Sequence, residues 1–104
     1  MHLATEMRGA WHIISVKGRA DSVTAGELTA ALLAAIAAHP QVAVDCSGVE
    51  YISSAGLNSL LEGERAARAA HHQLRVCAPS PRVKQVLEIS RLRDLLSVQE
   101  GLPC

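Results

Sequence analysis

Short apolar segments with strand character alternate along this chain with longer segments of helical periodicity, and this alternation restricts the fold more than any other feature. Residues 11–17 are rich in β-branched side chains, which favour strands. The segment after residue 24 repeats its apolar positions at helical spacing, on a face made of Leu28, Leu32, Ala35 and Ile36. Strands separated by helices predict a mostly parallel sheet with right-handed crossovers, so we expect an α/β fold.

The predicted elements follow the order β-β-α-β-α-β-α-β. Strands are expected at residues 2–8, 11–17, 41–46, 74–78 and 97–99, and helices after residue 24 to about 39, from 54 to about 70, and from 81 onward. A tight turn at Gly9-Ala10 makes the first two strands a hairpin, which adds an antiparallel edge to the sheet. The strand at 41–46 is apolar without alternation, as expected of a central strand buried on both faces.

Helix boundaries in the sequence carry recognisable end signals. Thr24 followed by Glu27 has the pattern of a capping box at the start of the first helix. Pro40 ends that helix, because proline cannot continue it. Ser80 followed by Pro81 predicts the start of the third helix, with serine as the cap and proline at the first helical position.

The second predicted helix has an interrupted apolar stripe. Its buried side is marked by Leu57, Leu60 and Leu61. Glu64 falls where this stripe should continue, and a carboxylate is costly to bury. We therefore expect the second half of this helix to lie away from the core.

The 104 residues are enough for one domain with its own core. Hydrophobic residues make up 49% of the chain but aromatic residues only 2%, so the core must be built from Ala, Leu, Val and Ile. We expect one domain over residues 1–104, with its core at about 2–99 and a loose tail at 100–104. Ten basic and ten acidic residues give a formal net charge of zero, which argues against direct nucleic-acid binding and favours a protein partner.

Targeting signals and cysteine usage indicate a cytoplasmic protein. No apolar run approaches the ~18 residues that span a bilayer, so we expect no membrane insertion. The N-terminus has no apolar stretch of the kind found in signal peptides. Cys46, Cys77 and Cys104 are widely spaced and form no CxxC pair. We expect Cys46 and Cys77 to be small buried residues and Cys104 to be exposed.

Signatures of enzymes and metal sites are mostly absent. The chain has no Walker loop, no GxGxxG and no GxSxG. Ser53-Ser54 could act as a nucleophile only if a histidine and Asp21 or Asp45 met it in space, which sequence spacing does not indicate. His71-His72 on a helix would point about 100° apart and could not share a metal ion. We expect neither an enzyme nor a metal site.

Two predicted loops should meet at one edge of the sheet. Asp21 follows the second strand and Ser54 the third, and the carboxyl ends of parallel strands lie at the same edge. Asp21 either supports only the turn before the first helix or forms a site together with Ser54. The pair Ser53-Ser54 either caps the second helix, a role worth ~1 kcal/mol, or carries a phosphate that the helix N-terminus would stabilise.

Three segments resemble one known family, in the same order along the chain. Residues 45–57, with the sequence DCSGVEYISSAGL, resemble the central motif of STAS domains, in particular of bacterial anti-sigma factor antagonists. Residues 18–21 with Thr24, Glu27 and Leu28, and residues 77–83 with Val86, Leu87 and Leu92, resemble the segments on either side of it. The resemblance implies a single STAS-like α/β domain, with a mixed four- to five-stranded sheet and helices mainly on one side.

The resemblance also implies a phosphorylation switch. In this family a partner serine kinase, which is also an anti-sigma factor, phosphorylates a serine at the start of the second helix. The unphosphorylated protein binds the kinase, and phosphorylation releases it. With Gly56 and Leu57 aligned, the phosphorylated serine falls on Ser54 and the second hydroxyl residue on Ala55. Ser53 replaces an acidic residue of the motif and is the alternative acceptor.

The implied partners are the anti-sigma factor/serine kinase and a PP2C-type serine phosphatase. ATP and Mg²⁺ belong to the kinase, so no cofactor is implied for this chain. The implied partner-binding surface consists of Asp21, Ser53, Ser54, Gly56 and Asn58. An alternative function is a non-cycling STAS subunit of a membrane transport complex or a signalling scaffold. The glycines that often close the family's second helix are His71-His72 here, so we expect that turn to be built differently.

Overall fold

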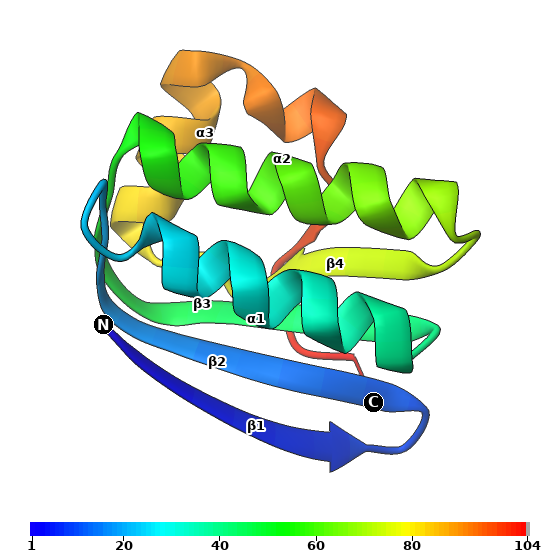
Figure 1. Ribbon diagram of the computed structural model, residues 1–104. Coiled ribbons are helices and arrows are strands. Elements are labelled where there is room, and N and C mark those ends of the chain that lie inside the picture. The colour runs from blue at the N-terminus through cyan, green and yellow to red at the C-terminus, as the bar shows by residue number, and fades with distance from the viewer. Residues whose placement is uncertain (104) are drawn as a thin grey trace.

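A computed structural model describes residues 1–103, which form one five-stranded mixed sheet with helices packed against it (Figure 1). The strands are β1 (His2–Arg8), β2 (Trp11–Ala20), β3 (Gln41–Ile52), β4 (Gln73–Cys77) and β5 (Val98–Gln99). The helices are α1 (Ala25–Ala38), α2 (Ser54–Ala69), α3 (Pro81–Ser90) and a short 3-10 helix, η1 (Leu92–Leu95). The predicted order of elements is confirmed, and η1 is added before the last strand.

The strands lie in chain order, β1-β2-β3-β4-β5. β1 pairs with β2 antiparallel around the predicted turn, where Gly9 has a φ of 60°. The pairs β2–β3, β3–β4 and β4–β5 are parallel, and each is joined by a helical connection. Because parallel strands need such crossovers, the alternation in the sequence is sufficient to explain this topology.

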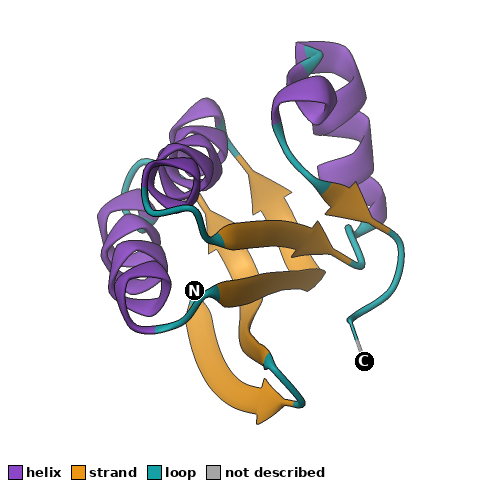
Figure 2. Ribbon diagram, turned by 90° about the vertical axis from the view of Figure 1, so that its right-hand side faces the viewer, coloured by secondary structure: helices purple, strands orange, loops and turns teal. Residues whose placement is uncertain are grey.

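The α-helices lie on one side of the sheet, as predicted (Figure 2). They share a core with strand residues Ile14, Val16, Val42, Val44, Leu74 and Val76. The buried face of α1 is the predicted one. On the opposite face of the sheet lies a smaller cluster of Trp11, Ile13, Ala43 and Cys77, and Leu102 packs against it.

β2 and β3 are longer than the sequence predicts. β2 continues through Gly18 to Ala20, and β3 continues beyond Cys46 to Ile52. The two strands stay paired because β3 accommodates extra residues at two irregularities in the register. The polar segment before α2, expected to be a loop, is therefore mostly extended strand.

α2 packs against the core along its whole length, so the expectation that Glu64 turns its second half outward is wrong. The contact continues through small residues: Ala67 is fully buried, and a Cβ on Gly63 would lie 3.0 Å from Leu74 Cδ2. Glu64 itself is only 6% exposed and forms an ion pair with Arg68 at 3.6 Å. Small residues hold α2 close to β4, and this draws the carboxylate inward.

The expectation that the turn after α2 is built differently from the family's glycine turn is wrong. His71 has a φ of 58°, in the left-handed region that glycine normally occupies. Its N–H donates to Arg68 O at 3.1 Å, and His72 N–H donates to Ala67 O at 2.8 Å. This is the Schellman hydrogen-bond pattern. The chain keeps the turn that a glycine would make and places a histidine in it.

The predicted capping box at α1 is wrong, whereas the cap of α3 is confirmed. The Thr24 hydroxyl makes no cap hydrogen bond and donates instead to Arg19 O at 2.9 Å. At α3, Ser80 Oγ accepts from Val83 N–H at 3.3 Å, with Pro81 at the first helical position. Thr24 differs because the end of β2 lies within reach of its hydroxyl.

The C-terminal segment packs against the sheet instead of being loose. Leu102 contacts the cluster around Trp11, and Pro103 is buried. The expectation for Cys104 lies outside the described residues. Among residues 1–103, the structure contains no helix with the length and apolarity needed to cross a membrane.

Candidate functional site

The ends of β2 and β3 bring the two predicted site segments together. Ala20 pairs with Ile52, and Ser53 N–H donates to Ala20 O at 2.9 Å. Asp21 and Ser53 are the residues that follow this pair, so the predicted proximity of Asp21 to the serines is confirmed. We call this region, consisting of residues 21–24 and 53–58, the carboxyl edge; it lies on the left in Figure 1.

The loop at Asp21 is held by a dense set of hydrogen bonds. Asp21 Oδ1 accepts from Val23 N–H at 3.0 Å and from Thr24 N–H at 3.3 Å. Thr24 Oγ1 accepts from Asp21 N–H at 2.9 Å, and Arg19 Nε lies 3.5 Å from Asp21 Oδ2. Burial acts to raise the pKa of Asp21, but these hydrogen bonds outweigh it and the pKa lies below its usual value. Asp21 therefore supports the turn, and its part in partner binding stays a prediction.

The two serines have different surroundings. Ser53 is the N-cap of α2, and its Oγ accepts from Gly56 N–H at 3.4 Å. Ser54 is the first residue of α2, is exposed, and makes no side-chain hydrogen bond to residues 1–103. The capping and phosphate-carrying roles, which the sequence left open for both residues, are therefore separable: Ser53 caps the helix and the hydroxyl of Ser54 is free.

Gly56 is a packing residue. It is buried, and a Cβ at this position would lie 2.5 Å from Ala20 O and 2.9 Å from Ile52 Cγ1. Only glycine allows α2 to approach the end of β2 this closely. A partner contact by Gly56 stays a prediction; in the structure its role is to let the first turn of α2, which carries Ser54, approach the end of β2.

Asn58 and Val23 complete the exposed part of the carboxyl edge. Asn58 lies one turn after Ser54, and its Nδ2 donates to Glu62 Oε1 at 3.4 Å. Val23 is 89% exposed, at the tip of the hydrogen-bonded loop. The sequence analysis did not single out Val23. The sequence did contain an indication of its exposure: Val23 is an apolar β-branched residue in a short polar segment outside the predicted strands and helices.

Charge in the first turn of α2 favours an anion. The first turn of α2 contains no acidic residue, and its N–H groups give the helix end a partial positive charge. The Arg19 guanidinium lies over the Tyr51 ring, 4.3 Å from the centroid, and also pairs with Asp21. A negative group on Ser54 would therefore meet no carboxylate within its own helical turn.

The residues considered for catalysis and metal binding do not assemble at this edge. In residues 1–103 neither serine is hydrogen-bonded to a histidine, and no group of three or more His, Cys, Asp or Glu side chains could hold a metal ion. His72 Nδ1 lies 2.7 Å from Ile36 O, beyond the other end of α2. Burial raises the pKa of Cys46 to about 12 and that of Cys77 to about 11, as expected of buried thiols.

Comparison with known proteins gives consistent matches over most of the chain. A family model described as "Mlab, STAS domain" matches residues 3–97. BtrV of Bordetella bronchiseptica, provisionally named an anti-sigma factor antagonist, is 32% identical over 87 residues, covering 83% of this chain and 75% of BtrV.

Solved structures share the architecture. An anti-sigma factor antagonist from Mycobacterium paratuberculosis matches with a TM-score of 0.82 at 26% identity, over 97% of this chain and 86% of that one. The Bacillus cell fate determinant SpoIIAA in its phosphorylated form matches with a TM-score of 0.71 at 20% identity, over 94% of this chain and 91% of its own. At that identity the second likeness shows the fold alone.

Proposed function

This chain belongs to the STAS-domain family, and we propose that it is an anti-sigma factor antagonist whose binding to a serine kinase is ended by phosphorylation at Ser54. The observation that carries the proposal is the difference between the two serines. Ser53 Oγ is occupied by the N–H of Gly56, whereas Ser54 is exposed and its hydroxyl is free. A kinase can modify Ser54 without breaking the helix cap.

A phosphate on Ser54 would change the surface while leaving the fold intact. It would stand at a helix N-terminus, where backbone N–H groups and the helix dipole favour anions. It would bring a charge of about −1.5 to −2 to a chain whose formal net charge is zero. A partner surface matched to the unmodified edge would then face a desolvation cost and repulsion from any nearby carboxylate.

The proposed partner surface consists of Asp21, Val23, Ser53, Ser54 and Asn58. Asp21 and Ser53 act by fixing the loop and the helix start, and Gly56 sets how closely the start of α2 approaches the end of β2. Val23 offers an apolar group on a loop that is already ordered, so little entropy is lost when a partner covers it. The partner is then a protein with an apolar depression beside the site that receives Ser54.

The names of relatives support the proposal. BtrV is named as an anti-sigma factor antagonist, and SpoIIAA has been solved in a phosphorylated form. On this basis the proposed partner is an anti-sigma factor; that it is also a serine kinase and supplies the ATP and Mg²⁺ follows from the family resemblance of the sequence. A PP2C-type serine phosphatase would restore the unmodified state. The chain itself acts as a binding module and not as an enzyme.

Phosphate incorporation tests the acceptor. The purified chain is incubated with its candidate kinase and Mg-ATP, and its intact mass is measured. We expect a gain of about 80 Da for the wild type and for Ser53→Ala, and no gain for Ser54→Ala. Modification of Ser54→Ala but not Ser53→Ala would transfer the role to Ser53.

Binding tests the switch. In a pull-down with the kinase, Ser54→Ala should bind whether or not ATP is present, and Ser54→Asp should not bind. Equal binding of the two variants would contradict the proposal. A wild-type chain that binds a partner but never takes up phosphate would point to the alternative, a non-cycling STAS subunit of a membrane transport complex or signalling scaffold.

A further inference from the structure

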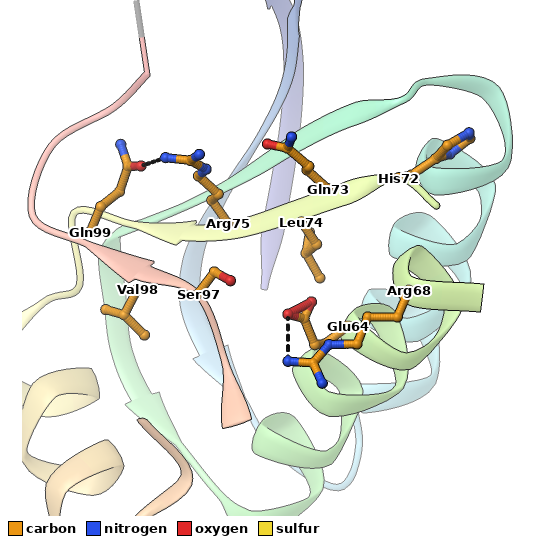
Figure 3. A pocket seen from close by; sticks show the side chains of 9 residues that line it. All are labelled: Glu64, Arg68, His72, Gln73, Leu74, Arg75, Ser97, Val98 and Gln99. Carbon is orange, nitrogen blue, oxygen red and sulfur yellow. Dashed lines mark hydrogen bonds and ion pairs between the residues drawn. The ribbon is translucent and has the colours of Figure 1, made fainter. Parts of the chain in front are cut away.

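A cavity of about 450 Å³ lies between the second half of α2 and the outer edge of β4 (Figure 3). Its walls include Glu64 and Arg68 from α2, Leu74 from β4, and Ser97 from the segment leading into β5. Glu64 stands ten positions after Ser54, about 15 Å farther along the helix axis. The cavity is therefore separate from the carboxyl edge, and its volume is in the range of small-molecule sites.

The cavity exists because β5 covers only part of β4. Val76 N–H donates to Ser97 O at 2.8 Å, and Ala78 N–H donates to Gln99 O at 3.0 Å. Backbone groups alternate sides along a parallel strand, so the N–H and C=O of Leu74 point toward the same side as those of Val76. Opposite Leu74 the segment that precedes β5 has not yet joined the sheet, and within residues 1–103 these two groups have no backbone partner. One donor and one acceptor of the β4 edge therefore face the cavity.

Glu64 supplies a second acceptor there. The residue is 6% exposed, yet its nearest cationic atom, Arg68 Nη2, lies at 3.6 Å, beyond hydrogen-bond distance. No other described residue donates a hydrogen bond to this carboxylate. Among residues 1–103 the Glu64 oxygens are not among the buried atoms that lack a partner, so they open onto the cavity and can accept from a ligand there. In Figure 3 the side chains of Glu64, Leu74 and Ser97 point toward one another, so the carboxylate is aimed into the cavity.

We propose that this cavity binds a free α-amino acid. Each of its two main walls offers one donor and one acceptor: the Arg68 guanidinium and Glu64 carboxylate on α2, and the N–H and C=O of Leu74 on β4. A zwitterion complements both walls, because its ammonium donates to Glu64 and to Leu74 O while its carboxylate accepts from Arg68 and from Leu74 N–H. The Ser97 hydroxyl can serve either group.

The rim of the cavity selects the side chain and the size of the ligand. Arg75 and Gln99, hydrogen-bonded at 2.9 Å, line the part of the cavity that reaches the other face of β4, where the Arg75 guanidinium lies 5.1 Å from the centroid of the Trp11 ring. An amino acid with an acidic or amide side chain fits this rim better than one with an apolar side chain. The open stretch of the β4 edge is short, because Val76 N–H is already bonded to Ser97 O, so it suits one amino acid better than an added peptide strand.

The test is a titration of the ¹⁵N-labelled full chain, followed by amide shifts. The probes are glutamate, glutamine and leucine, with acetate and methylamine as ligands that carry one charge only. We expect saturable shifts at Leu74, Ser97 and the second half of α2 at about millimolar glutamate or glutamine, and weaker effects from leucine. No saturable shift at about 10 mM amino acid, or equal shifts from acetate or methylamine, would overturn the proposal.

Two variants locate the ligand. Glu64→Gln keeps the shape of the side chain and removes its charge, and should weaken binding by about tenfold or more. Glu62→Gln, on the same helix but bonded to Asn58, is the matched control and should bind normally. If Glu64→Gln does not fold, Arg68→Gln replaces it, since the Arg68 side chain is 68% exposed. Unchanged affinity in the folded variant would overturn the proposal.

Discussion

The loops at the two ends of the parallel strands connect strands and helices in the same way, but different side chains hold them in place. At the carboxyl edge, Asp21, Thr24 and Ser53 hold the loop and the helix start with hydroxyl and carboxylate oxygens. At the opposite edge, which we call the amino edge, the closing residues are His12, His39, His71 and His72. The His12 and His39 rings stack with centroids 4.1 Å apart, and His72 Nδ1 lies 2.7 Å from Ile36 O.

The difference shows how one end of a small domain is made available for binding. At the carboxyl edge the side-chain oxygens that hold the loop and the helix start are already hydrogen-bonded. The hydroxyl of Ser54 and the side chain of Val23 remain free to contact a partner. At the amino edge His12 and His39 stack on each other, and His72 contacts a carbonyl of the last turn of α1. The carboxyl edge should therefore respond to phosphate and partners, and the amino edge should respond to pH through His12, whose pKa is lowered by burial.

The largest effect should come from Gly56→Ala. The new Cβ would meet Ala20 O at 2.5 Å, and backbone cannot move aside as a side-chain tip can, so we expect a loss of about 2–3 kcal/mol. Urea unfolding measures it. Gly63→Ala on the same helix is the control: its Cβ meets Leu74 Cδ2 at 3.0 Å, and the gain in helix propensity offsets that contact. Equal losses would show that the carboxyl edge is not unusually tight.

Val23→Ser should weaken partner binding by about tenfold, or ~1.4 kcal/mol, because an exposed apolar anchor is lost. Stability should not change, since the side chain is 89% exposed. Ile89→Ser on α3 removes a side chain that is 76% exposed and lies outside the carboxyl edge, so it serves as the control. Affinity for the kinase can be measured by calorimetry. A larger loss with Ile89→Ser would move the proposed surface to α3.

Ser53→Ala should cost about 1 kcal/mol, because it removes the N-cap of α2. Ser54→Ala should cost almost nothing, since its hydroxyl bonds to none of residues 1–103. Thermal unfolding of the two variants compares them directly. If both lost the same stability, the division between a capping serine and a free serine would not hold.

His71→Gly should stabilise the protein by about 0.5–1 kcal/mol, because glycine adopts a left-handed conformation without the strain that a side chain brings. His71→Ala, which keeps a Cβ, is the control and should bring no such gain. Chemical denaturation provides the measurement. A loss of stability on substitution by glycine would mean that the histidine side chain contributes to the amino edge in a way that its exposure does not suggest.

The smallest expected effect is the loss of stability at acidic pH that His12 causes. Burial lowers the pKa of His12, and the neighbouring His39 lowers it further; Nδ1 is buried with no hydrogen-bond partner among residues 1–103. Below the ordinary pKa of about 6.5 the unfolded chain takes up a proton that the folded chain resists, so stability is full above that value and falls as pH drops toward the folded pKa. His12→Gln should lose less stability than the wild type between pH 7.5 and 5.5. Equal losses in thermal unfolding would contradict this.

Elements with strong periodicity were predictable. The buried face of α1, the hairpin around Gly9 and the cap at Ser80 follow from local signals that the structure leaves unchanged. The errors lie where the folded arrangement offers a group a partner or a contact that the local pattern does not indicate. Thr24 had the capping pattern, but Arg19 O was within reach. Glu64 interrupted the apolar stripe, but Gly63 and Ala67 let α2 stay on the sheet.

By itself, the sequence determined the order of elements, the mostly parallel sheet and the family, because periodicity, turn residues and a long motif are local properties. It also placed Asp21 and the serine pair at one edge, since parallel strands end together. Only the tertiary structure decided which serine is free, why residue 56 must be glycine, and where Val23 stands. These depend on the 2.5 Å approach that a Cβ would make to Ala20 O and on hydrogen bonds between segments far apart in the chain, which no local pattern encodes.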